Sequence, residues 1–135
     1  MIVFDASTVV AAALNPNGIP RRALVHARTH DRLAMSEPVA AEIREVIRRP
    51  KFAGLLTPSR QAEIVGLLFT DVDWFVPQVN VTDCRDPKDN KYLELALVAG
   101  ASTIVSSDYD LLTLDPWRCV RVLRATEYLA HVQAT

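Results

Sequence analysis

Short apolar runs alternate with longer amphipathic segments along the whole chain. The runs are rich in Val, Ile, Leu and aromatic residues and are too brief for helices, which is typical of buried strands. Such strands are expected at residues 2–4, 33–35, 74–76, 103–106 and 120–123. Because segments with helical spacing separate them, the pattern predicts an α/β domain with a mostly parallel sheet.

The segments between the strands carry recognisable helix start and stop signals. Ser7 or Thr8 is expected to cap the first helix, Pro50 to stop a helix after Arg49, and Gly100 to end a later one. Helices are therefore predicted at residues 9–14, 20–29, 37–49, from 58 onward, 92–99 and 126–132. No repeat, low-complexity tract or linker interrupts the pattern, so a single domain over residues 1–135 is expected.

Composition and charge narrow the class of protein. The 135 residues are 50% hydrophobic and 23% charged, which excludes a disordered tail, and the net charge of −1 excludes a globally basic nucleic-acid binder. The charge is unevenly distributed, however. Residues 1–60 sum to +4 and residues 61–135 to −5. The near-neutral total is therefore compatible with a local basic surface.

Several site types and locations are not indicated by the sequence. No apolar run approaches the roughly 20 residues that cross a bilayer, and the opening residues lack the features of a signal peptide, so a cytoplasmic location without membrane contact is expected. Cys84 and Cys119 lack metal-ligand or redox spacing and are expected to be reduced thiols. His26, His30 and His131 show no ligand spacing with the acids, which argues against a zinc hydrolase.

Acidic residues follow two of the predicted strands. Asp5 comes directly after the first strand, and Asp108 and Asp110 follow the strand at 103–106. Catalytic and binding groups of open parallel sheets gather outside the carboxyl ends of the strands. Asp5 and Asp108 are therefore expected at one edge of the sheet if these two strands are parallel neighbours.

Two further acids belong to predicted helices. Glu42 lies at the edge of the apolar stripe of its helix, whereas Glu45 is spaced for a surface pair with Arg49. Asp86 has the position of a helix cap, which explains Asp89, one turn further on, less well. Several carboxylates repel one another unless a cation neutralises them, and oxygen ligands suit Mg²⁺ or Mn²⁺. The acids together therefore favour a divalent-metal site.

These features match the PIN-domain family, and the resemblance covers essentially the whole chain. The segments that carry it are Ile2-Val3-Phe4-Asp5-Ala6-Ser7, the helix-borne Glu42, the segment from Asp89 to Ala96 and the segment from Val105 to Leu112. Together, in this order, they resemble the ribonuclease toxins of prokaryotic toxin–antitoxin modules, the VapC-like branch. The resemblance implies a three-layer α/β/α sandwich.

The resemblance also implies a ribonuclease that uses Mg²⁺ or Mn²⁺, with Asp5, Glu42, Asp89 and Asp108 as its catalytic and metal-binding acids. Ser7, Ser106, Asn90 and Asp110 are expected beside these acids, where hydroxyls would orient carboxylates or phosphate. Many relatives carry an acid at the position of Asn90, and Asp86 or Asp110 remains an alternative ligand. The family also implies a small antitoxin partner and often a homodimer.

The basic surplus of the first half supplies candidate contacts to RNA phosphates. They are Arg21, Arg22, Arg44, Arg48, Arg49 and Lys51, and a solvated helix face is the alternative explanation of this set.

Two other functions remain open from the sequence. One is a PIN-like binding module with weak or no turnover, for which Asn90 is the only support. The other is a phospho-accepting receiver-like domain, which also has an Asp at a strand end. A receiver needs paired acids near the first strand and a Lys after the last, and this chain has Arg124 there.

Overall fold

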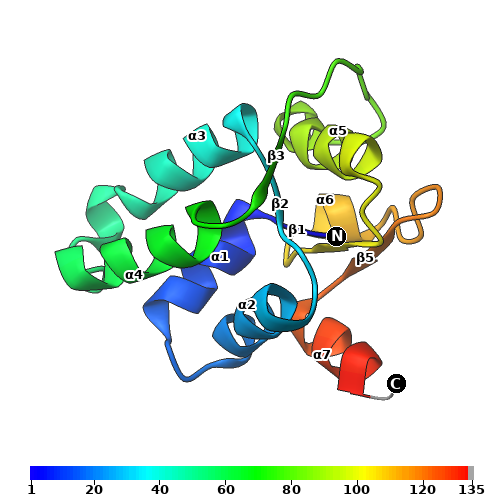
Figure 1. Ribbon diagram of the computed structural model, residues 1–135. Helices are drawn as coiled ribbons and strands as arrows, with labels where there is room; N and C mark the ends of the chain where they lie inside the picture. The colour runs from blue at the N-terminus through cyan, green and yellow to red at the C-terminus, as the bar shows by residue number, and fades with distance from the viewer. Residues whose placement is uncertain (134–135) are drawn as a thin grey trace.

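The computed structural model describes residues 1–133 as an α/β fold with short strands (Figure 1). The strands are β1 (Ile2–Phe4), β2 (Ala34–Ser36), β3 (Asp73–Phe75), β4 (Thr103–Val105) and β5 (Arg121–Leu123). The helices are α1 (Ala6–Leu14), α2 (Ile19–His30), α3 (Glu37–Ile47), α4 (Pro58–Phe69), α5 (Asn90–Ala99), α6 (Tyr109–Leu112) and α7 (Ala125–Gln133). Two 3₁₀ turns, η1 (Pro50–Phe52) and η2 (Pro87–Asp89), complete the order.

All described strand pairs are parallel. β4 pairs with β1 on one side and with β5 on the other, while β2 pairs with β3. A parallel bridge between Ile2 and Leu33 joins the two groups, and the Ile2 N–H donates to the Arg32 carbonyl at 2.8 Å. The strand order across the sheet is therefore β3-β2-β1-β4-β5. This confirms the predicted parallel sheet and makes β1 and β4 central neighbours.

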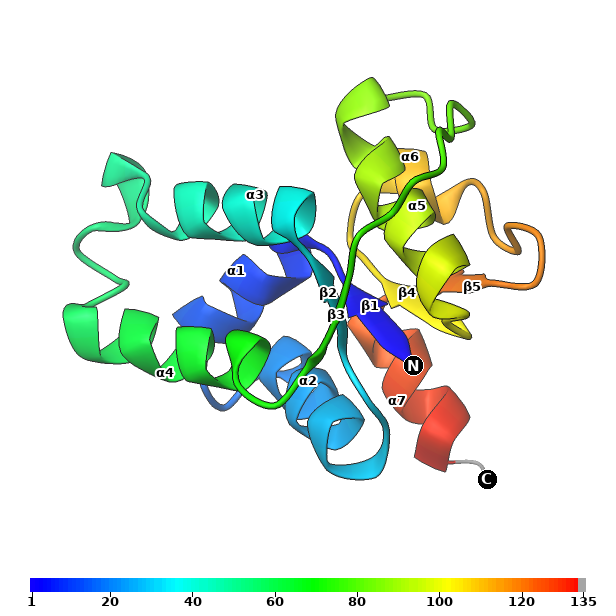
Figure 2. The same ribbon diagram turned by 45° about the horizontal axis from the view of Figure 1, so that its top comes forward.

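Helices cover both faces of the sheet, as expected for three α/β/α layers. α5 packs against β1, β2, β3 and β4, whereas α2 packs on α1 and α7, and α7 packs on β5. α3 and α4 both contact α1. Figure 2 shows α5 and α6 on the opposite side of the strands from α1, α3 and α4. The core lies between these layers, where Val3, Val9, Leu93 and Ile104 are fully buried.

The strand order also separates this fold from a receiver-like domain. Doubly wound receivers place the third strand next to the first, in the order 2-1-3-4-5. Here β3 lies at the sheet edge beside β2, and β4 pairs with β1. The receiver-like alternative therefore does not fit the topology.

Some local expectations were wrong in detail. The first helix begins at Ala6 and is capped by Asp5, not by Ser7 or Thr8, because the Asp5 carboxylate accepts the Thr8 N–H. α3 ends at Ile47 rather than Arg49, and the chain then turns into η1. The short helix α6 was not expected, since four residues are too few for a helical period. Trp74, expected in the core, is 43% exposed on β3.

Two further sequence expectations can be checked directly. No helix within residues 1–133 has the length and apolar character needed to cross a membrane. Cys84 and Cys119 are free thiols, Cys84 buried and Cys119 exposed.

The position of Ile104 gives a test of the sheet. Ile104 is fully buried in β4, between β1 and β5, so Ile104→Ala leaves a cavity and is expected to lower the unfolding free energy by about 2–5 kcal/mol. Val76→Ala is the control, because Val76 is 80% exposed and the change should stay within about 0.5 kcal/mol. Urea unfolding measures both variants, and equal effects would contradict the central position of β4.

Candidate active site

Parallel pairing of β1 with β4 brings two acids to one edge of the sheet. Asp5 follows β1, and its N–H donates to the Val105 carbonyl at 3.1 Å, which continues the pairing by one residue. The Ser106 hydroxyl donates to Asp5 Oδ2 and accepts the Asp108 N–H at 2.9 Å. Ser106 thus connects the backbone that carries Asp108 to the carboxylate of Asp5.

The Asp5 carboxylate is buried but well supplied with donors. The Thr8 N–H donates to Oδ1 at 2.9 Å, and the Ser7 hydroxyl lies 2.8 Å from the same oxygen. Burial raises the pKa of Asp5, while the hydrogen bonds from Ser106, the Thr8 N–H and Ser7 lower it. Ser7 is in turn held by the Ser107 hydroxyl at 2.8 Å. The carboxylate is therefore fixed in orientation from both strand ends.

Glu42 reaches the site from α3 and contacts the first turns of α5. The Tyr92 hydroxyl donates to Glu42 Oε1 and accepts the Ala6 N–H at 3.1 Å. Lys91 Nζ lies 3.2 Å from Glu42 Oε2. Burial, followed by the neighbouring Glu42 carboxylate, raises the pKa of Tyr92, so its hydroxyl keeps the proton that it donates. Both oxygens of Glu42 therefore have partners from α5.

One hollow of about 240 Å³ brings the expected acids together. Its lining consists of Asp5, Ala6, Ser7, Glu42, Val46, Arg49, Asp86, Lys88, Asp89, Tyr92 and Asp108. All four acids predicted from the sequence are included. Of the two spare acids, Asp86 lines the hollow and Asp110 does not.

Asp86, Asp108 and Asp110 each also have a structural role in the local backbone. Asp86 caps η2 by accepting the Lys88 N–H at 3.1 Å, so the expected capping role and a place in the hollow coincide. Asp108 caps α6 by accepting the Asp110 N–H at 2.9 Å. Asp110 contributes its backbone to this cap, and its carbonyl accepts from the Cys84 thiol.

Asp89 is a second buried carboxylate of the hollow with a raised pKa. Its side chain is buried, and its Oδ2 has no hydrogen-bond partner among the described residues. Burial is the largest cause that raises the pKa of Asp89 to about 7, and the neighbouring carboxylates of Asp108, Asp86 and Glu42 raise it further. An unpaired carboxylate oxygen surrounded by negative charge is a place where a cation would be favourable.

The donor set fits a hard divalent cation. Carboxylate oxygens are the ligands that Mg²⁺ and Mn²⁺ prefer, and Asp89 Oδ2 is an unused donor of this kind. Among residues 1–133, no group of three or more Asp, Glu, His or Cys side chains is placed so that it could hold a metal ion. The hollow therefore offers suitable oxygen donors but no preformed set of metal ligands.

The Asn90 side chain forms a structural hydrogen bond that the sequence did not reveal. Its carbonyl oxygen accepts the Cys84 N–H at 2.8 Å, and both residues are buried. Four residues along α5, Glu94 Oε2 accepts the Val81 N–H at 3.0 Å. These two bonds attach the segment at 77–86, which precedes η2, to α5. Asn90 thus holds the loop that carries Asp86.

The six basic residues expected to contact RNA do not lie together on one surface. Arg49 lines the hollow while pairing with Glu45 at 3.0 Å, the surface pair expected from their spacing. Arg44 stacks over the Phe69 ring at 4.7 Å on the α4 side of α3. Arg48 and Lys51 are exposed beyond the end of α3.

Arg21 and Arg22 lie away from the acids. Arg21 is buried, donates to the Ala12 carbonyl at 3.1 Å and pairs with Glu63. That placement does not suit a phosphate contact. Arg22 lines grooves between α2 and α7 instead of the acidic hollow. Lys88, which lines the hollow, was not singled out from the sequence because it stands in an acidic segment.

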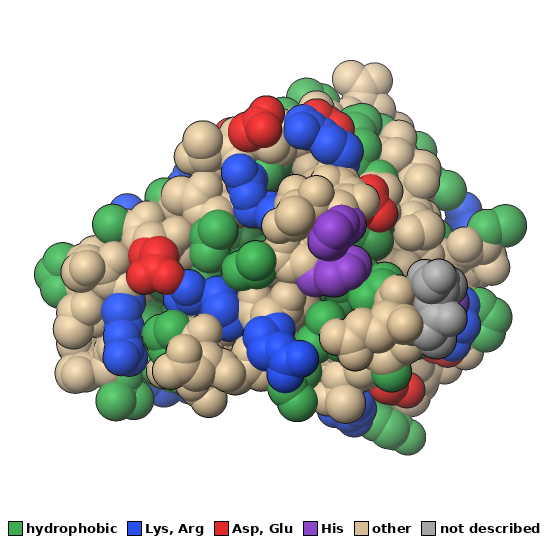
Figure 3. Space-filling view, turned by 60° about the horizontal axis from the view of Figure 1, so that its bottom comes forward, with side chains coloured by type: hydrophobic (Ala, Val, Ile, Leu, Met, Phe, Trp, Pro, Cys, Tyr) green, Lys and Arg blue, Asp and Glu red, His purple; other side chains and the backbone are tan. Residues whose placement is uncertain are grey.

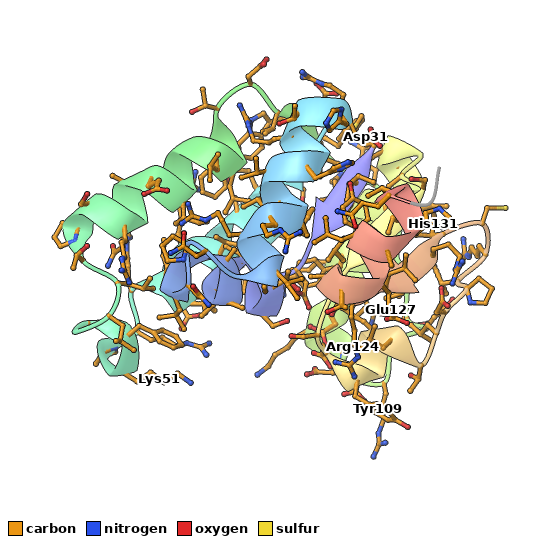
Figure 4. All side chains as sticks on the ribbon, turned by 90° about the horizontal axis from the view of Figure 1, so that it is seen from below. Asp31, Lys51, Tyr109, Arg124, Glu127 and His131 are labelled. Atoms are coloured by element: carbon orange, nitrogen blue, oxygen red, sulfur yellow. The ribbon has the colours of Figure 1, made fainter. Side chains whose placement is uncertain are left out.

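The two ends of the sheet differ in chemistry. Figure 4 shows Lys51, Tyr109 and Arg124 on one side of the molecule and Asp31 and His131 on the other. A larger hollow of about 590 Å³ lies at that second side, lined by His26, His30 and His131 among others. Figure 3 shows His side chains together on this face, and the rings of His26 and His30 lie 4.5 Å apart.

That larger hollow lacks the charge of the acidic one. Among the described residues that line it, Asp31 is the one carboxylate, and it pairs with the N-terminal ammonium at 2.6 Å. The smaller hollow at the carboxyl ends of β1 and β4 is therefore the candidate active site, despite its smaller volume.

Comparison with known proteins agrees with this architecture. The family model described as "PIN domain" matches residues 1–110, which include all four predicted acids. An uncharacterized protein of Methanocaldococcus jannaschii is 29% identical over 115 residues, which span 84% of this chain and 74% of that protein. No solved structure matches the chain.

Asp89 gives a pH-dependent prediction. The pKa of Asp89 is raised to about 7 in the folded protein, compared with its ordinary value of 3.8. Ionisation of Asp89 therefore destabilises the metal-free fold above pH 7, and this loss of stability disappears as the pH falls toward 3.8. Asp89→Asn removes the charge and is expected to stabilise the metal-free protein at pH 8 by about 1–3 kcal/mol, with no gain near pH 4.

Thermal unfolding in a chelator at both pH values measures this effect. Asp110→Asn is the matched control, because Asp110 does not line the hollow and its carboxylate should contribute little. A loss of stability in Asp89→Asn at pH 8 would show that its ionised carboxylate is a stabilising group instead.

Proposed function

Because the chain belongs to the PIN-domain family, a nuclease-type fold, we propose that it is an endoribonuclease that hydrolyses RNA phosphodiester bonds with Mg²⁺ or Mn²⁺. The observation that carries the proposal is the crowding of five carboxylates around one hollow, with a buried oxygen of Asp89 left without a partner among the described residues. Crowded carboxylates are costly without a cation, and hydrolysis of a phosphodiester is the chemistry that such a cation serves.

Asp5, Asp89 and Asp108 are the proposed ligands of the ion. Asp5 and Asp108 come from adjacent strand ends, and Asp89 adds the unpaired oxygen. When bound, a divalent ion lowers the pKa of water and stabilises charge on the phosphate and on the leaving oxygen. Asp86 lines the same hollow and remains an alternative ligand.

The surrounding residues of the chain would hold these acids in place. Ser7 and Ser106 donate to Asp5 from two directions, which keeps its carboxylate oriented and opposes the rise in its pKa that burial causes. The α6 cap restrains Asp108 in the same way. Preorganisation of this kind lowers the cost of assembling the site at the moment of reaction.

Basic residues on the rim are proposed to bind the RNA backbone. Arg49 and Lys88 line the hollow, and Arg48 and Lys51 are exposed near the same end of α3. Arg21 is left out of this proposal because it is buried. Arg22 and Arg44 are less favoured, since one lines another groove and the other stacks on Phe69.

A toxin role with a small antitoxin partner, and a homodimer, are also proposed, and the sequence resemblance supports them. A growth assay is the direct test: induction of the chain should arrest growth, Asp5→Asn should not, and co-expression of a small protein encoded beside it should restore growth.

The proposed place of action is the cytoplasm, where the RNA substrate is made in prokaryotes. The binding-module alternative rested on Asn90, whose amide holds a loop and so offers no support for lost turnover.

Asp5→Asn tests the catalytic proposal. The amide keeps the shape and the capping oxygen but loses the charge, so Mn²⁺-dependent cleavage of single-stranded RNA should fall at least about 100-fold, or about 2.7 kcal/mol in the barrier, while the fold is retained. Cleavage rates with Mn²⁺ and with chelator, together with circular dichroism, measure both effects. Asp110→Asn should keep nearly full activity. Undiminished cleavage by Asp5→Asn would refute the proposed nuclease site.

Arg49 and Lys88 give a test of RNA binding. Arg49→Ala or Lys88→Ala should weaken binding and reduce the slope of log affinity against log salt by about 0.7 for each lost phosphate contact. Arg22→Ala, which removes the same charge from the groove between α2 and α7, is the control. Salt titrations of affinity for an oligoribonucleotide measure the slopes, and equal slopes in all variants would exclude the rim as the binding surface.

A further inference from the structure

Lys91 lies in an unusual position for a cation. It is the second residue of α5, and a basic side chain in the first turn of a helix is unfavourable by about 0.3–1 kcal/mol because of the helix dipole. Its side chain is also largely buried, with 18% of its surface exposed. A contact that compensates both costs is therefore expected, and the structure contains one.

Three partners fix the Lys91 ammonium. Nζ lies 3.2 Å from Glu42 Oε2, donates to the Lys88 carbonyl at 2.5 Å and lies 5.4 Å from the centre of the Tyr92 ring. Glu42 itself is only 25% exposed, and its other oxygen accepts from Tyr92. The ammonium is thus held at the α3 side of the acidic hollow, next to one of the four acids.

Within residues 1–133, none of the other three acids forms an ion pair, although Arg49 and Lys88 line the same hollow. Asp5 is held by hydroxyl and N–H donors, Asp108 by the N-terminus of α6, and Asp89 has an oxygen without a partner. The charge of Glu42 is balanced by the chain, whereas the charge on the side of Asp89 is not. A second divalent ion bound through Glu42 would require Lys91 to leave that carboxylate, at the cost of an ammonium without its partner.

We propose that Lys91 takes the place of a second divalent ion, so that the site binds one ion among the three aspartates while Glu42 stays paired with the lysine. This rests on the proposed metal-dependent function and defines its stoichiometry. Lys91 is accordingly a positioning residue, because it acts through Glu42 and contacts neither the ion nor the substrate.

Titration of the full chain with Mn²⁺ tests the proposal. Calorimetry, with free Mn²⁺ followed by electron paramagnetic resonance, should give one ion per chain for the unaltered protein. Lys91→Met keeps an unbranched side chain of nearly the same length, removes the ammonium and leaves Glu42 uncompensated, so a second ion should bind. Lys91→Gln can still donate to Glu42 without a charge and should also bind a second ion, which covers a failure of Lys91→Met to fold.

Two further variants separate the pair from general charge. Lys88→Met removes the same charge from the wall of the same hollow without changing the Glu42 pair, and it should still bind one ion. Adding Glu42→Gln to Lys91→Met should return the stoichiometry to one, because the uncompensated carboxylate is gone.

The outcomes distinguish this inference from the proposed function. Two ions on the unaltered protein, or a single ion on both Lys91 variants, would overturn the role of Lys91 even if RNA cleavage depends on Mn²⁺. No Mn²⁺ binding and no cleavage would overturn the proposed function and this inference together. If Lys88→Met also bound a second ion, the loss of any positive charge from the hollow would explain the result. That outcome would overturn the role of the pair between Lys91 and Glu42.

Discussion

Mutual repulsion among carboxylates is the constraint around which this structure is organised. Parallel pairing of β1 and β4 places Asp5 near Asp108, and α3 and η2 add Glu42 and Asp89 to the same hollow. Three of these acids have partners of different kinds. Asp5 accepts from backbone and hydroxyl donors, Asp108 accepts from the N-terminus of α6, and Glu42 contacts the Lys91 ammonium and the Tyr92 hydroxyl. Asp89 differs from these three, because its buried Oδ2 has no hydrogen-bond partner among the described residues and its pKa is raised to about 7.

Much of the fold was accessible from the sequence because its signals are local. Short β-branched runs separated by helical periodicity predicted the strands, and the parallel arrangement followed from their alternation with helices. The rule that groups gather at the carboxyl ends of parallel strands then selected Asp5 and Asp108. Glu42 and Asp89 followed from their position relative to the apolar stripes and from the family resemblance, and all four acids do line one hollow.

The remainder depends on contacts between distant segments, which a local pattern does not encode. The bond from Tyr92 to Glu42 joins residues 50 positions apart and needs the packing of α5 beside α3. Arg21 looked like a surface cation, yet the packing of α1 and α2 buries it against the Ala12 carbonyl. Asn90 looked like a lost ligand, yet its partner is the backbone of a preceding loop. In each case the residue type was visible, but its partner was not.

The double use of Asp5 has a consequence for how this chain tolerates change. The carboxylate that belongs to the acidic hollow also caps α1, and α1 is the helix on which α2, α3 and α4 pack. Replacement by an apolar residue would remove the cap, at a cost of about 0.5–2 kcal/mol, as well as the charge. Such a replacement of Asp5 would therefore lower the stability of the fold in addition to removing an acid from the hollow. The architecture ties the stability of the fold to a residue of the acidic hollow.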